Sequence, residues 1–178
     1  MHEQSKLNEA KYFYSRMLSE TGNRENLLFD LSAFLSAARS VLQYALKEAQ
    51  TKSGGQQWYN GQVTSSDVLK FFRTKRNVNV HTEPIQVSQH ISIHLSDIVH
   101  FSESIHIKNS DQTDKLIGEY SSEPSQPPPT PDIPPIVSYR FTFPDWNGRE
   151  DVLQLCEMYL EELQRVVTDG QSKGFLTK

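Results

Sequence analysis

Cysteine and long hydrophobic runs are both scarce in this sequence of 178 residues. The single cysteine, Cys156, has no partner for an internal disulfide and cannot build a cysteine-based zinc site. No apolar run approaches the roughly 20 residues that a membrane-spanning helix needs. No apolar stretch of signal-peptide type follows the N-terminus. We therefore expect one cytoplasmic domain, residues 1–178, with no membrane contact.

Several motifs of enzyme chemistry are also missing. The chain has no Gly-x-Ser-x-Gly sequence, which disfavours a serine hydrolase. It has no glycine-rich phosphate loop either, because Ser53-Gly54-Gly55 only ends a predicted helix. We expect no cofactor.

The chain contains six histidines, and the imidazole is a common metal ligand. His90 and His94 share one face of a predicted strand, and His100 and His106 share a face of the next. Paired across a hairpin, they could hold zinc. Polar residues belong on the outward face of a half-buried hairpin in any case, and no cysteine or carboxylate lies at ligand spacing. We predict no metal site.

The net charge of −4 argues against a globally basic surface for nucleic acid. One segment departs from this balance, because no carboxylate occurs between Asp67 and Glu83. Its basic residues are Lys70, Arg73, Lys75 and Arg76. The cluster is either a solvated helix face or a local site for an anion.

Apolar residues at three- and four-residue spacing predict four helices. Their ranges are about 6–19, 25–51, from a cap at Ser65 or Ser66 to near His81, and from 147–150 to 168. A loop containing Trp58 and Tyr59 is expected between the second and third. The second helix carries a polar line that is either exposed or places Arg39 beside a buried polar site. This line consists of Ser32, Ser36, Arg39 and Gln43.

Alternation of apolar and polar residues predicts strands at 89–95, 99–107 and 137–143. The first two read as an antiparallel hairpin. The proline-rich stretch 124–135 is expected to be a linker, although it could engage an SH3-like partner. The predicted fold is thus α+β and mainly α. It is a four-helix bundle with an antiparallel sheet of about three strands, inserted at 87–143 before the final helix.

The segment Arg76-Asn77-Val78-Asn79-Val80-His81 could carry chemistry. In a helix, Asn77 and His81 lie about 40° apart, one turn along the same face. An imidazole can transfer protons to and from the oxygens of a phosphodiester. A neighbouring guanidinium can stabilise charge on the phosphoryl oxygens. A strand at 77–80 would remove this arrangement.

The arginine, the polar residue after it and the later histidine, at the end of a helix in a small bundle, resemble the HEPN domain superfamily. The long second helix, reading Leu31-Ser32-Ala33-Phe34-Leu35-Ser36-Ala37-Ala38-Arg39-Ser40, fits the same pattern. The resemblance covers about residues 6–84 and 147–168 and implies a HEPN-like bundle that forms a homodimer.

The resemblance also implies an activity, a metal-independent endoribonuclease that cleaves RNA by 2′-hydroxyl attack. His81 would transfer protons, Arg76 would stabilise the phosphate and Asn77 would orient the histidine or the RNA. RNA or a nucleotide would be bound by four basic residues. These are Lys70, Arg73, Lys75 and Arg39.

Two other interpretations stay open. HEPN-like proteins without activity serve as nucleotide-binding or assembly modules. An interaction protein could instead use its β-insertion and proline-rich loop to recruit an antitoxin or another protein partner.

Overall fold

The computed structural model describes residues 2–81, 85–94, 102–108, 114–121 and 136–177, and for 76–81, 102–108 and 114–121 it describes the backbone only. Over these residues the chain is mainly helical, as predicted. Its helices are α1 (His2–Ser19), α2 (Arg24–Ala49), α3 (Gly55–Ser65), α4 (Asp67–His81) and α5 (Val152–Ser172). Two compact units are formed, one by Met1–Ile91 with Ser138–Lys178 and the other by Ser92–Val137.

Polar side chains fix where the helices begin. The Asn23 side chain accepts hydrogen bonds from two backbone amides of the first turn of α2, each at 3.1 Å. Asp151 and Gln154 form a reciprocal capping box at the start of α5. The Ser66 hydroxyl accepts a bond from the Leu69 amide at 3.2 Å and so caps α4. Of the two cap residues that the sequence allowed, Ser66 is the one used.

Helix α3 was not predicted, and the expected loop around Trp58 and Tyr59 is wrong. Tyr59 and Val63 are buried one turn apart, which gives this short helix an inward face. Gly55 is the first residue of α3 and lies against the backbone of Ala49 at the end of α2. A Cβ at Gly55 would lie 2.0 Å from the Ala49 carbonyl oxygen, so only glycine permits the close junction.

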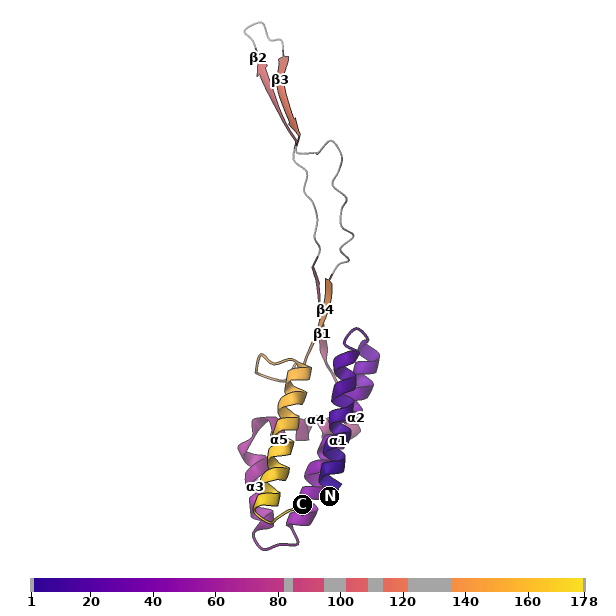
Figure 1. The fold of residues 1–178 in the computed structure, drawn as a ribbon, viewed down its shortest axis with the longest axis vertical. Helices are drawn as coiled ribbons and strands as arrows, with labels where there is room; N and C mark the ends of the chain where they lie inside the picture. Colours follow the sequence, from indigo (N-terminus) through magenta and orange to yellow (C-terminus); the bar gives the residue numbers. More distant parts are fainter. Residues whose placement is uncertain (1, 82–84, 95–101, 109–113, 122–135, 178) are drawn as a thin grey trace. The chain divides into compact units, whose positions relative to one another are not determined.

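The helices pack around α2, which contacts all four of the others. Helix α1 also packs along α5, and Figure 1 shows these long helices side by side. An aromatic cluster joins α2, α4 and α5. The rings of Phe72 and Tyr159 are stacked with centroids 4.4 Å apart, and Phe34 meets them edge-on at 6.4 and 6.1 Å. Such pairs are stabilising beyond their buried area, and they hold α4 against the core.

The segment after the last strand packs on α4 from another side. Phe143 and Trp146 contact the Phe71 ring at centroid distances of 5.4 and 4.9 Å. The Lys75 ammonium lies 5.0 Å from the Phe143 centroid and pairs with Asp145 at 2.5 Å. Helix α4 is therefore held on two sides before its last turns.

In the described residues the strands form two separate pairs rather than one sheet of about three strands. They are β1 (Ser88–His94), β2 (Ser102–Lys108), β3 (Asp114–Ser121) and β4 (Ile136–Thr142). Strand β1 pairs with β4, and β2 pairs with β3 in antiparallel register from Ser102↔Ser121 to Lys108↔Asp114. The predicted pairing of 89–95 with 99–107 is wrong, because alternation predicts a strand but not its partner.

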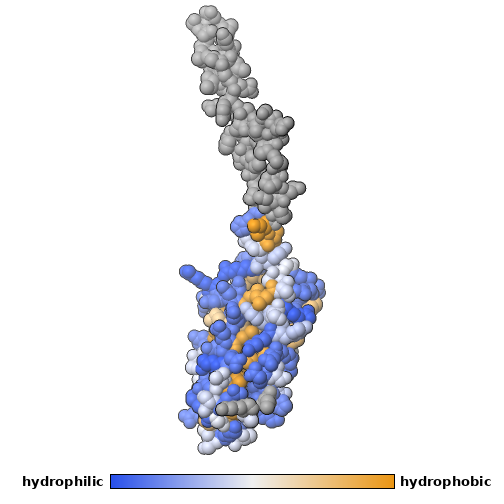
Figure 2. Space-filling view, in the orientation of Figure 1, coloured by the Kyte–Doolittle hydropathy of each residue, from blue (hydrophilic) through white to orange (hydrophobic). Residues whose placement is uncertain are grey.

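Strand β3 lies in a stretch that the sequence did not mark as a strand. Its register is irregular, since Gly118 faces Ile105 and Leu116 faces His106, which leaves Ile117 opposite no partner. At this bulge the apolar residues Leu116 and Ile117 follow each other directly. The alternation of apolar and polar residues that identifies a strand is therefore interrupted. On the other pair, Ile91, Ile93 and Ile136 are exposed, and Figure 2 shows hydrophobic colour at these strands on an otherwise largely hydrophilic face.

Candidate functional site

The segment with the Arg–His motif is helical. Helix α4 is unbroken from Asp67 to His81, so Asn77 and His81 are one turn apart in the chain. Arg73 precedes Asn77 by the same spacing, which aligns these three positions along one side of the helix. The side chains of Arg76, Asn77 and His81 lie outside the described residues.

Two of the four expected binding residues have local partners. Lys75 is only 12% exposed in its side chain and its charge is neutralised by Asp145. It therefore holds the Phe143–Trp146 segment on α4. Lys70 is exposed and forms a pair with Asp67 at 3.0 Å, one turn earlier. Arg39 and Arg73 form no ion pair with a described carboxylate.

Arg39 occupies an unusual environment on α2. The residue is half-buried, yet its Nε and Nη1 atoms are fully buried and have no hydrogen-bond partner among the described residues. Buried guanidinium nitrogens normally have acceptors, because each unsatisfied donor loses its hydration without replacement. The sequence left open whether Arg39 is exposed or lies beside a buried polar site. The structure supports the second alternative.

Tyrosines from two other helices lie near this guanidinium. Tyr59 of α3 is 6% exposed, and its hydroxyl interacts with Arg39. Burial raises the pKa of Tyr59, while the charges of Arg39 and Arg73 oppose the rise. Burial likewise raises the pKa of Tyr159 on α5, again opposed by Arg39. Both phenols are therefore protonated at neutral pH. We call Arg39, Tyr59 and Arg73 the arginine–tyrosine cluster.

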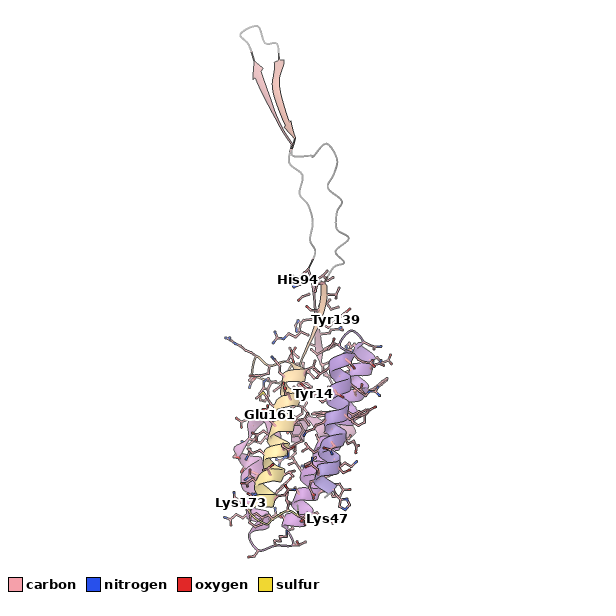
Figure 3. All side chains as sticks on the ribbon, in the orientation of Figure 1. Tyr14, Lys47, His94, Tyr139, Glu161 and Lys173 are labelled. Atoms are coloured by element: carbon pink, nitrogen blue, oxygen red, sulfur yellow. The ribbon has the colours of Figure 1, made fainter. Side chains whose placement is uncertain are left out.

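A hollow lies between α1 and α5, with a volume of about 410 Å³. Tyr14 and Glu161 face it from opposite helices (Figure 3). Burial and the charge of Glu157 raise the pKa of Tyr14 to about 12. Lys11 also lines the groove, but it already donates to Gln164 at 3.1 Å. Two carboxylates disfavour a phosphate here, so the arginine–tyrosine cluster suits an anion better.

The described residues contain neither a cluster of metal ligands nor a membrane-spanning helix. No three histidine, cysteine or carboxylate side chains gather there in a way that could hold a metal ion. The zinc alternative required strands 89–95 and 99–107 to pair, whereas His90 lies 3.3 Å from Thr142 of β4. His100 lies outside the described residues. No described helix is long and apolar enough to cross a membrane.

Comparisons with protein-family models, with curated proteins and with solved structures found no match for this chain. Every functional statement therefore depends on the residues themselves.

Sequence reasoning missed the two tyrosines near Arg39. The sequence predicts a loop around Tyr59, and the signal against a loop is the four-residue spacing of Gly55, Tyr59 and Val63. Tyr159 stands among the apolar residues of α5, and nothing in the sequence connects it with α2. Only the packing of α5 on α2 brings its phenol near the guanidinium.

Proposed function

We propose that this protein is a metal-independent endoribonuclease of the HEPN type. One observation carries the proposal, the continuous helix α4, which aligns Arg73, Asn77 and His81 on successive turns. Phe72 holds the first half of this helix against Phe34 and Tyr159, which fixes the direction in which the row continues. Rigid presentation of reacting groups is a large part of enzymatic rate enhancement.

The proposed reaction needs only groups that the motif supplies. The imidazole of His81 removes the proton of an RNA 2′-hydroxyl or protonates the leaving 5′-oxygen. Arg76 stabilises the charge that develops on the phosphoryl oxygens. Bond formation between the 2′-oxygen and phosphorus breaks the bond to the 5′-oxygen and leaves a 2′,3′-cyclic phosphate. One histidine cannot easily serve both oxygens, so the proposal includes a homodimer in which two motif helices meet.

The test uses purified protein and labelled single-stranded RNA in the presence of a chelator. We expect cleavage with 2′,3′-cyclic phosphate ends, and losses of at least about 100-fold in His81→Ala and Arg76→Ala. Lys47 is an exposed residue of α2 (Figure 3), and Lys47→Gln removes one positive charge, as Arg76→Ala does. This variant is therefore the control for the loss of charge. Circular dichroism and thermal unfolding establish that each variant is folded.

Two results would count against the proposal. Equal cleavage by the wild type and both motif variants would identify a contaminating nuclease. A strict monomer in light scattering, with full activity, would exclude the composite cleft while keeping the chemistry.

A second candidate function is a nucleotide-binding or assembly module without catalysis. The open donors of Arg39 favour it, because they can bind an anion without any contribution from His81. RNA that binds saturably but stays intact across many sequences would select this candidate over the nuclease.

A further inference from the structure

We propose that the arginine–tyrosine cluster is a phosphate-binding subsite, in which Arg39, Tyr59 and Arg73 hold a backbone phosphate of an RNA chain. This subsite deepens the proposed function, since its RNA is the substrate of that function. Phosphate binding at Arg39 nevertheless requires no catalysis, so the two proposals can fail separately.

The first step of the argument is the unmatched donors. A guanidinium can pair with oxyanions along two edges, and Nε and Nη1 of Arg39 lie on different edges. Both atoms are buried and neither has an acceptor among the described residues. A phosphate at either edge would supply an acceptor that the described residues do not provide. These unmatched donors are the feature that an anion would satisfy.

The second step is the surrounding charge. Arg73 adds a second positive charge near Tyr59, and no described carboxylate is paired with either arginine. Tyr59 keeps its proton, so its O–H can donate to a ligand. Two cations and a hydroxyl suit a tetrahedral phosphate.

The third step is position along α4. Arg73 and His81 are separated by eight residues, a rise of about 12 Å. A single phosphate cannot reach both positions, whereas a polynucleotide can contact Arg73 and continue towards His81. Among sources of phosphate, the geometry therefore points to RNA rather than to a free nucleotide.

The experiment measures binding of a labelled single-stranded RNA by fluorescence anisotropy, with inorganic phosphate as a separate arm. Arg39→Met keeps an unbranched stem but removes the guanidinium, and Arg39→Lys keeps the charge but not the planar fork. We expect RNA affinity to fall roughly 10- to 100-fold in Arg39→Met. Arg39→Lys should be intermediate, and the control Lys47→Gln on the same helix should bind like the wild type.

Salt dependence separates a direct phosphate contact from a structural effect. Loss of one phosphate contact to a single strand should reduce the slope of log affinity against log salt by about 0.7. Arg39→Met should show this change, and Tyr59→Phe should weaken binding without it. A merely misfolded variant would lose bound fraction and thermal cooperativity together.

Several outcomes would overturn the subsite. One is equal RNA affinity and equal salt slope in the wild type and Arg39→Met. Another is binding of a polyglutamate peptide by a wild-type protein that binds neither RNA nor phosphate, because the cluster would then recognise an acidic protein segment. RNA binding that depends on Arg39 but yields no cleavage refutes the nuclease and sustains the subsite.

Discussion

Removing Arg39 should weaken RNA binding without weakening the fold. Each buried donor that lacks an acceptor costs about 1–3 kcal/mol. Two such atoms on a half-buried side chain therefore cost roughly 2 kcal/mol in the free protein. Arg39→Met removes both donors and keeps much of the apolar contact of the stem. It also removes the charge that interacts with the buried Tyr59 hydroxyl, which costs about 1–2 kcal/mol.

These opposing changes predict a double-mutant cycle. Arg39→Met alone should alter the free energy of unfolding by less than about 1 kcal/mol. Adding Tyr59→Phe removes the orphaned hydroxyl, so the double variant should be about 1–2 kcal/mol more stable than the wild type. Lys47→Met, at an exposed position of α2, should change stability by no more than about 0.5 kcal/mol.

The assay is urea unfolding followed by circular dichroism in phosphate-free buffer, then repeated with inorganic phosphate. Phosphate at 100 times its dissociation constant should stabilise the wild type by about 2.7 kcal/mol, and the double variant should not respond. A double variant that is less stable than the wild type by more than about 1 kcal/mol would refute the reasoning. Arg39 would then be satisfied and structural.

Three further predictions concern the rest of the helical unit. Asp169 accepts from the Trp58 indole at 2.6 Å, and this bond lowers the pKa of its carboxyl. Asp169→Asn should therefore cost about 1 kcal/mol at pH 7, and in urea titrations this difference should vanish as the pH falls below about 4. The pKa of Tyr14 is raised to about 12, so folding favours its protonated form, and its contribution is lost as the pH rises from about 10 towards 12. Tyr14→Phe should thus retain more stability than the wild type in alkaline urea titrations. Gly55→Ala should cost about 2 kcal/mol or more in thermal unfolding, because its Cβ would overlap the Ala49 carbonyl oxygen.

How well the sequence predicts each helix depends on the width of its apolar face. Helices α2 and α5 bury residues at most turns and have clear caps, so the helical spacing of their apolar residues can be recognised in the sequence. Helix α3 is 11 residues long, buries only three of them and contains glycine at two positions. Its stability comes from packing, including the Trp58–Asp169 bond to α5. Propensity alone could not have identified it.

The alternation of apolar and polar residues could not predict which strands pair, for a different reason. Period two reports which residues face inward, and every pairing of two such strands satisfies it equally. The pair β1–β4 joins segments more than 40 residues apart, as the contact of His90 with Thr142 shows. Only tertiary contacts make that choice, and the hairpin that the zinc alternative required is not the pairing that forms.

The sequence identifies Arg39 as a candidate site residue but does not predict whether its side chain is buried. At about 100° per residue, Arg39 lies about 40° from the buried Leu35 and about 60° from the exposed Ser36. A residue at such a border can turn outward or inward, and the helical wheel cannot distinguish these alternatives. The choice is made by α3, which brings Tyr59 to the guanidinium. Because α3 could not be predicted, the sequence could not predict the burial of Arg39 or its neighbour Tyr59.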